Sequence, residues 1–331
     1  MQTSELTNDS KAILLLCGVF RKKSENEGKE SLTVREYNLV ENWLLTQNLT
    51  PASFLEPHVV EAFKEEKDVL INPLRLESLL QRGAELAFAV EKWVNNGIWI
   101  VTRSDESYPD ILRRRLNHQC PPILYGTGDQ SLFDCAGLAV VGSRNVDEAG
   151  EEYTMEVGKQ CAAEGMAITS GGARGVDNIA MESVLEAGGV AVGVLPNNLL
   201  RTSVSGTFRD AIVDRRLLLI SSVNPEAGFN VGNAMIRNKY IYALSSYALI
   251  ISSEAEKGGT WSGAVEELRR KNHIPVFVRM EGNPPEGNIK LRGKGAMSFP
   301  PRPWTEPLAD KLKSISPPPP PKDDQGDLFA S

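Results

Sequence analysis

The sequence predicts an α/β protein: a doubly wound, mostly parallel sheet with a small N-terminal helical domain. Two observations support the sheet. Continuous apolar runs alternate with helical patterns from residue 137 to residue 278, which is typical of parallel strands buried on both faces. Glycine-rich turns follow several of these runs. A third observation supports the helical domain, because residues 11–97 carry apolar side chains at helical spacing.

The composition is that of a soluble globular protein with room for about two domains. The 331 residues are 41% hydrophobic, and no apolar run approaches the ~20 residues that a membrane span needs. The first ten residues lack the basic start of a secretion signal, and the four cysteines lack metal-ligand spacing. We therefore expect a cytoplasmic protein with no metal, no cofactor and no membrane partner.

The net charge of −7 argues mildly against a generic nucleic-acid binder, but the charge is unevenly distributed. Residues 1–100 carry 11 Lys/Arg against 15 Asp/Glu, whereas residues 206–300 carry 13 against 9. The later part of the chain therefore permits a basic face.

The N-terminal domain is predicted to span residues 1–97. One helical pattern runs from Thr33 to Leu45. A second begins at Asn72-Pro73, a cap followed by proline at the first helical position, and a third runs from Ala84 to Gly97.

The sheet domain is predicted to span residues 98–281. Gly97–Val101 indicates an entering strand, and residues 108–125 indicate a turn-rich approach. Within the approach, Arg113-Arg114-Arg115 is either a solvated helix face or a phosphate contact. Six further strands are predicted at residues 138–141, 166–169, 190–195, 216–220, 249–251 and 274–278.

Beyond the sheet domain the apolar period is lost. Residues 282–314 are predicted to be an irregular C-terminal extension, with a short helix near Leu308. Residues 315–331 are predicted to be a proline-rich linker, including Pro317–Pro321, and an acidic tail.

Three polar or glycine-rich segments follow predicted strands, at the edge where open α/β sheets bind ligands. They are Gly142-Ser143-Arg144, Ser170–Asp177 and Ser252–Thr260. The second segment joins a strand to a helix, an arrangement that aims backbone N–H groups and a helix N-terminus at an anion. An ordinary tight turn is the alternative for this segment alone. The three together predict a phosphate-binding pocket.

Arg144 and Arg174 are the predicted phosphate ligands, because a guanidinium presents a planar fork to oxygens. Asp177 either caps its helix or contacts the ligand. The remaining residues predicted to face the pocket are Gly142, Ser143, Ser170, Gly171, Gly172, Gly175, Arg237, Asn238, Lys239, Gly259 and Thr260. No catalytic residue is predicted, since neither a Ser/His/Asp arrangement nor an acidic cluster accompanies the loops.

These motifs resemble the DNA-processing protein A family (DprA/Smf) in order and approximate spacing. The resemblance covers residues 97–280. The segments that carry it are Tyr108-Pro109, Pro121-Pro122, Leu124-Tyr125, residues 141–144, 170–177, 237–241 and 244–245, Gly259-Thr260 and Ala264.

The resemblance implies an extended Rossmann-like domain that binds single-stranded DNA. We therefore expect a binding protein and not an enzyme. It further implies that the protein protects this DNA and promotes loading of a RecA-type recombinase, in recombination, uptake (natural transformation) or repair. A homodimer is also implied. Carried over to this chain, the residues that would line the DNA or phosphate pocket are Arg144, Ser170, Gly171, Gly172, Gly175, Arg237, Asn238 and Lys239.

Several departures mark the chain as a divergent member. Family members usually have histidine where Met181 stands, phenylalanine where Met235 stands and threonine where Gly263 stands. Arg279-Met280 replaces a Pro-Gly after the last strand, and no C-terminal winged helix is evident.

The tail offers a further resemblance. Gln325-Gly326-Asp327-Leu328-Phe329 is similar to the short peptide by which many bacterial DNA-repair proteins dock on the sliding clamp. A disordered tail without a partner is the alternative.

Two other functions stay open. One is a nucleotide-binding sensor or a phosphoribohydrolase of the LOG family, although that family's pattern places glutamate where Gly263 stands. The other is a regulatory or antitoxin subunit of a phage-defence system.

Overall fold

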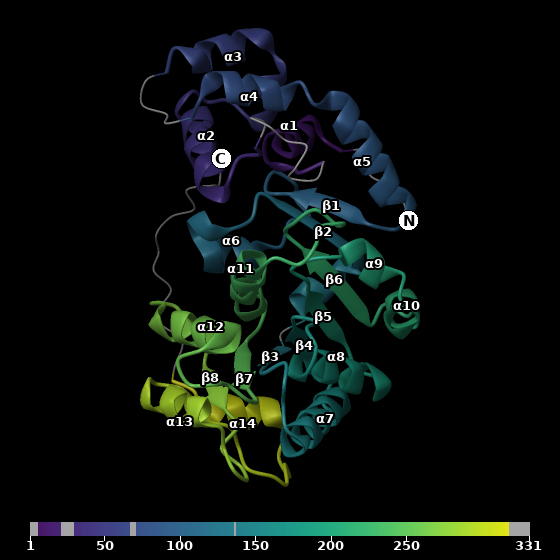
Figure 1. The fold of residues 1–331 in the computed structure, drawn as a ribbon, viewed down its shortest axis with the longest axis vertical. Helices are drawn as coiled ribbons and strands as arrows, with labels where there is room; N and C mark the ends of the chain where they lie inside the picture. The colour runs from purple at the N-terminus through teal and green to yellow at the C-terminus, as the bar shows by residue number, and fades with distance from the viewer. Residues whose placement is uncertain (1–5, 21–29, 67–70, 136, 318–331) are drawn as a thin grey trace.

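The structure, a computed structural model, describes residues 6–20, 30–66, 71–135 and 137–317. Within these residues a nine-stranded sheet runs through the molecule in the order β1-β2-β6-β5-β4-β3-β7-β8-β9. Its β1–β2 and β2–β6 pairs are antiparallel, and the other pairs are parallel. Figure 1 shows the sheet below a cap of N-terminal helices. The predicted fold class is confirmed.

The strands are short, and most of their residues are buried. They are β1 (Trp99–Thr102), β2 (Ile123–Gly128), β3 (Gly137–Val141), β4 (Ala167–Ser170), β5 (Ala191–Val194), β6 (Leu217–Ser221), β7 (Tyr247–Ile250), β8 (Val276–Val278) and β9 (Met297–Ser298).

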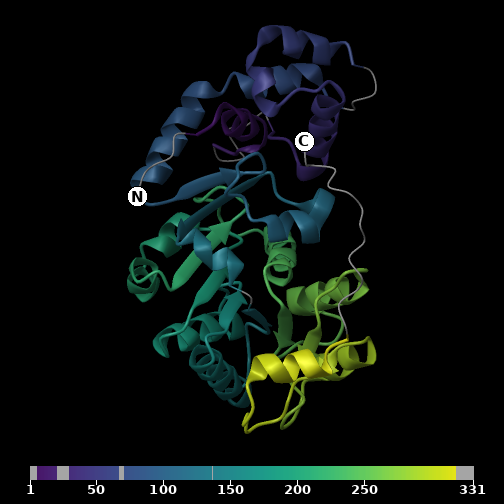
Figure 2. The same cartoon turned by 180° about the vertical axis from the view of Figure 1, so that it is seen from behind.

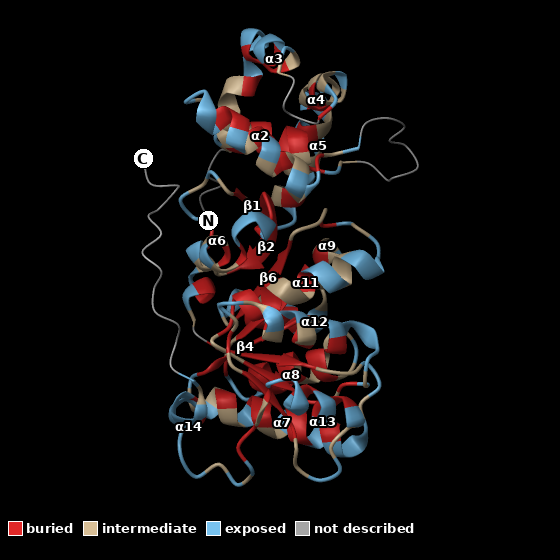
Figure 3. Ribbon diagram, turned by 90° about the vertical axis from the view of Figure 1, so that its left-hand side faces the viewer, coloured by how far each residue is buried: buried red, intermediate tan, exposed pale blue. Residues whose placement is uncertain are grey.

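Helices cover both faces of the sheet because successive strand residues point to opposite sides. In β3, Leu138 and Val140 join one core, and Ala139 and Val141 join the other. The first core also receives α7 (Glu148–Ala163), α8 (Val176–Glu186), α9 (Leu199–Ser203), α10 (Gly206–Val213) and α14 (Leu308–Ile315). The second receives α6 (Asp110–Leu116), α11 (Val231–Ala243), α12 (Gly258–Arg269) and α13 (Glu286–Gly293). Figure 3 shows the buried strands between these half-exposed helices.

The N-terminal helices pack on the β1–β2 edge of the sheet. They are α1 (Asn8–Cys17), α2 (Val34–Thr46), α3 (Pro57–Lys64), α4 (Pro73–Leu80) and α5 (Gly83–Asn95). Asn72 caps α4, as the sequence predicts, and Thr33 caps α2. Trp93 of α5 meets Tyr125 of β2 edge to face, with ring centroids 5.0 Å apart. The helical domain and the sheet therefore share one apolar core.

The segment predicted to be a turn-rich approach contains a strand, so that prediction is wrong. Ile123–Gly128 forms β2, which pairs with both β1 and β6. Pro121 and Pro122 precede the strand and remove no hydrogen bond from its ladder. The prolines suggest a turn in the sequence, although the run that follows them is apolar and buried.

The arginine triplet on α6 is not simply a solvated face. Arg113 Nη2 donates to the Arg103 carbonyl oxygen at 2.7 Å, and Arg115 Nη1 donates to the Ala243 carbonyl oxygen at 3.1 Å. These two arginines join elements of the fold.

The C-terminal extension is more regular than the sequence suggests. Residues 282–314 contain α13, β9 and most of α14, and β9 pairs with β8 at the edge of the sheet. The Leu308 N–H donates to Glu164 Oε2 at 2.7 Å, which holds the start of α14 against the end of α7 (Figure 2). The sequence does not predict β9, because a strand of two residues between glycines and prolines is too short to show an apolar period.

Within the described residues, none of the helices combines the length and apolar character needed to cross a bilayer.

Candidate functional site

The predicted glycine-rich and polar segments meet at the carboxyl ends of β3, β4 and β7. Here β3 pairs with β4 on one side and with β7 on the other. From β3 the sheet grows through β4, β5 and β6 in one direction and through β7 and β8 in the opposite direction, so the strand order reverses at β3. Such a reversal is where open α/β sheets bind ligands. Residues 142–144, 170–177, 237–239 and 258–260 are referred to below as the carboxyl-edge site; they lie among α8, α11 and α12 (Figure 1).

The loop from β4 to α8 requires its glycines. Gly172 and Gly175 have φ values of +60° and +85°, a region that favours glycine. A Cβ on Gly175 would lie 2.4 Å from the Ser143 carbonyl oxygen, so the loops after β3 and β4 approach closely. The Val176 N–H, at the start of α8, donates to the same oxygen at 3.3 Å. Ser170 lies below the loop, where its hydroxyl donates to the Val140 carbonyl at 2.6 Å.

A buried ion pair supports this loop from beneath. Arg237 Nη1 of α11 donates to Asp177 Oδ2 of α8 at 3.1 Å, and the side chains are 6% and 8% exposed. Burial raises the pKa of Asp177, while Arg237 and the backbone N–H groups of Gly142 and Ala173 act to lower it. Asp177 therefore binds a residue of the protein, and Arg237 faces inward.

Two further hydrogen bonds fix the segments relative to one another. Thr260 Oγ1 donates to the Gly142 carbonyl oxygen at 3.0 Å, which joins α12 to the loop after β3. Asn238 Nδ2 donates to the Gly259 carbonyl oxygen at 3.0 Å, which joins α11 to α12. Most of the predicted polar side chains thus hold the site together.

The cations on the open side of the site are Arg144 and Arg174, both exposed. Arg174 Nη2 donates to Asn145 Oδ1, so the two loops also meet at the surface. The Arg144 guanidinium lies 5.0 Å from the centre of the Phe229 ring. Lys239 is half-buried and pairs with Glu266 at 2.9 Å. Ser143 makes a local turn, in which its hydroxyl accepts from the Asn145 N–H at 3.1 Å.

Exposed apolar side chains extend from Phe229, which the sequence does not single out. They lie in the loop before α11 and in its first turns: Phe229, Val231, Met235 and Ile236, between 47% and 64% exposed. Asn230 caps α11 by accepting from the Asn233 N–H at 3.2 Å. The site therefore combines exposed guanidinium groups with an apolar surface.

The acidic residues of α12 serve the fold. Glu266 pairs with Lys239, and Glu267, 3% exposed, accepts from the Ile274 N–H at 3.0 Å. Among the described residues, no group of His, Cys, Asp and Glu is arranged to hold a metal ion. The predicted clamp-docking residues Gln325, Leu328 and Phe329 lie outside the described residues.

Comparison with known proteins gives consistent results. The family model for DNA recombination-mediator protein A matches residues 99–300. Protein Smf of Escherichia coli is 28% identical over 203 residues, which cover 60% of this chain and 53% of that protein. Protein Smf of Synechocystis sp. is 27% identical over 167 residues, which cover 48% and 40%. The chain thus matches about half the length of these relatives, or less.

Solved structures show the same fold. DNA processing protein A of Streptococcus pneumoniae matches with a TM-score of 0.66 at 18% identity, over 89% of this chain and 95% of that one. The Helicobacter pylori protein of the same name, whose structure concerns its single-stranded DNA binding mode, matches with a TM-score of 0.51 at 23% identity. That match covers 66% of this chain and 95% of the other.

Proposed function

Because the chain belongs to the DNA recombination-mediator protein A family, we propose that it binds single-stranded DNA at the carboxyl-edge site and acts in DNA recombination. The observation that carries the proposal is the placement of Arg144 against Phe229 at the open side of the site. A single strand offers phosphates and unpaired bases together, and proteins bind it with cationic and aromatic side chains.

The phosphates would contact Arg144, Arg174 and backbone N–H groups of residues 171–175. A glycine turn before a helix N-terminus favours negative charge even without a lysine. Affinity should then fall steeply with salt and depend little on sequence.

The bases would lie on Phe229 and the neighbouring apolar side chains. Large apolar groups exposed beside a polar site indicate a contact surface. Double-stranded DNA keeps its bases stacked inside the duplex and cannot use such a surface.

Arg237 would act differently from the contact residues. Its charge is compensated by Asp177 inside the protein, so we propose that it positions the β4–α8 loop. Asn238 would position Gly259 in the same way.

The arrangement supports binding more than nucleotide hydrolysis. Gly263 stands where the hydrolase pattern has glutamate, and Glu266 and Glu267 have partners within the fold. We therefore propose that the protein is not an enzyme. From its family we further propose that it protects single-stranded DNA, promotes loading of a RecA-type recombinase and acts as a homodimer.

Fluorescence anisotropy with a labelled oligonucleotide, its duplex and mononucleotides tests this proposal. Single-stranded DNA should bind more tightly than the duplex, and mononucleotides should compete weakly. Tight binding of mononucleotides alone would replace DNA binding with a nucleotide sensor or hydrolase. If single-stranded DNA binds as proposed, strand-exchange assays with a RecA-type recombinase test whether the protein promotes loading.

A further inference from the structure

Arg279 is a buried arginine that the sheet places directly after β8. Its residue is 2% exposed, and its Nε donates to the Ile251 carbonyl oxygen at 3.1 Å, where β7 gives way to the loop toward α12.

The Arg279 guanidinium lacks a close counter-charge. Its Nη2 is buried without a hydrogen-bond partner. Asp147 Oδ1 forms an ion pair with this Nη2 at 3.9 Å. The Asp147 side chain is 65% exposed, and it already caps α7 by accepting from the Gly150 N–H. The positive end of α7, a 16-residue helix, begins beside it.

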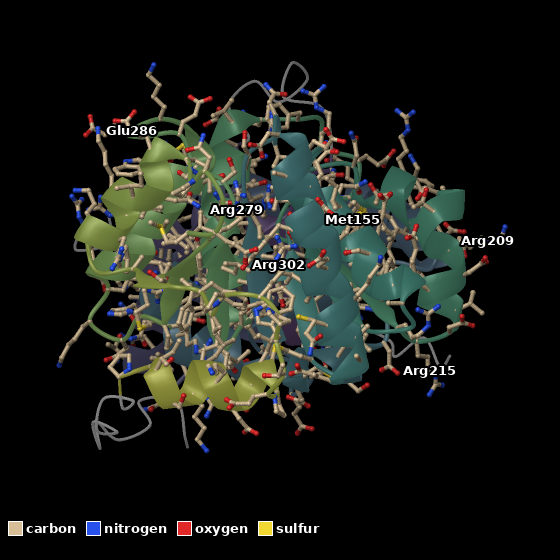
Figure 4. The ribbon with its side chains drawn as sticks, turned by 90° about the horizontal axis from the view of Figure 1, so that it is seen from below. Met155, Arg209, Arg215, Arg279, Glu286 and Arg302 are labelled. Atoms are coloured by element: carbon tan, nitrogen blue, oxygen red, sulfur yellow. The ribbon has the colours of Figure 1, made fainter. Side chains whose placement is uncertain are left out.

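Arg302 provides a contrast, because it lies over the ring of the same tyrosine as Arg279. The guanidinium groups lie over the Tyr153 ring, Arg302 at 5.0 Å from its centre and Arg279 at 5.8 Å. Figure 4 labels the two arginines. Arg302, however, pairs with Glu156 and with Glu281, at 2.6 Å each, and its side chain is 29% exposed. Arg302 is neutralised by two close carboxylates, whereas Arg279 has the distant Asp147 and a weaker Coulombic interaction with Glu281, which already pairs with Arg302.

We propose that Arg279 is a buried electrostatic residue of the carboxyl-edge site, which strengthens binding of a DNA phosphate without touching it. This inference rests on the proposed function. Arg279 contacts the two loops that carry site residues: Ile251 begins the loop that leads to residues 258–260, and Asp147 lies three residues after Arg144. A charge in a region that water does not screen acts over a longer range than one at the surface.

The melting temperature of an Arg279 variant separates an electrostatic role from a structural one. If Arg279 mainly stabilised the fold, replacing it would lower the melting temperature. A buried charge with poor compensation is costly, and replacing it by an apolar side chain of similar length is often neutral or stabilising. The Ile251 carbonyl would keep a partner in Arg279→Met, because Asn288 Nδ2 also donates to it at 3.1 Å. Loss of affinity without loss of stability would therefore identify an electrostatic role.

The test compares full-length Arg279→Met, Arg279→Lys and Arg302→Met with wild type, by oligonucleotide anisotropy and by thermal melting. Arg279→Met should bind about five- to tenfold more weakly at low salt, with an unchanged or raised melting temperature. Arg279→Lys, which keeps the charge, should recover most of the affinity. Arg302→Met should lower the melting temperature and change affinity less than twofold, since its charge is compensated and partly screened by water.

The outcomes separate the two proposals. If wild type does not bind single-stranded DNA, the proposed function fails. If wild type binds and Arg279→Met binds equally well, melts lower or fails to fold, the inference about Arg279 fails and the proposed function stands. An Arg279→Lys variant as weak as Arg279→Met would also overturn it.

Discussion

Arg237 Nη1 lies 3.1 Å from Asp177 Oδ2, and both side chains are more than nine-tenths buried beneath the glycine loop after β4. The pair connects α8 to α11 across the site. It makes Arg237 part of the support of the β4–α8 loop, although its sequence motif suggests a direct ligand. Truncation of Arg237 should therefore act through stability.

Arg237→Ala leaves the Asp177 carboxylate buried without its cation. Breaking a buried pair from one side costs about 3–5 kcal/mol, so the free energy of unfolding should fall by about 3 kcal/mol in urea titrations. DNA affinity should fall with it. A variant with wild-type stability and a smaller salt dependence of binding would instead make Arg237 a phosphate contact.

Phe229→Ala removes the aromatic ring that lies against Arg144. The ring is 53% exposed, so the melting temperature should stay near that of wild type. Affinity for single-stranded DNA should fall by about 1–3 kcal/mol, the contribution of one stacked base, with an unchanged salt dependence. If Phe229→Ala and wild type have equal affinities in an anisotropy titration, the apolar surface does not contact the DNA.

Gly171→Ala places a methyl group where the fold has no space. The added Cβ would lie 1.1 Å from Arg237 Nη1 and 2.5 Å from Asp177 Oδ2. The ion pair must then move, and both the melting temperature and DNA affinity should drop. Gly206→Ala at the start of α10 is the matched control, since nothing lies within 4 Å of its added Cβ. Equal behaviour of the two variants would contradict the packing described.

Glu36 should stabilise the N-terminal domain in a pH-dependent way. Hydrogen bonds from Arg75 lower the pKa of Glu36 from 4.5 to about 2. A lowered carboxyl pKa means that the stabilisation is complete above pH 4.5 and is lost as the pH falls toward 2. Glu36→Gln keeps a capping acceptor and should cost about 1 kcal/mol or less at pH 7. In melting curves the difference from wild type should narrow below pH 4.5; a constant difference would exclude the charge effect.

The parallel part of the fold is predictable because each buried strand is a continuous apolar run that ends in a polar turn. Leu138–Val141 followed by Gly142 is an example. The strands that escape prediction carry less pattern: β2 follows two prolines, and β9 has two residues. Their pairing depends on neighbours distant in the chain.

The candidate site is predictable in location and less so in the roles of its residues. Glycines and arginines after strands mark the edge where they meet. The chain gives no sign that Asp177 pairs with a residue 60 positions away, nor that Phe229 points outward beside Arg144. Apolar residues in a sequence usually indicate core, and Arg279 after a strand gives no indication of burial.

The central claim, that phosphates of single-stranded DNA bind the carboxyl-edge site, is tested most directly by salt-dependent anisotropy of Arg144→Ala and Arg174→Ala. Each lost phosphate contact should reduce the slope of log affinity against log salt by about 0.7. Lys64→Ala is the control, because Lys64 lies on α3 and pairs with Glu61 and Glu77. The account predicts smaller slopes in both arginine variants and an unchanged slope in the control. Wild-type slopes in both arginine variants would contradict it.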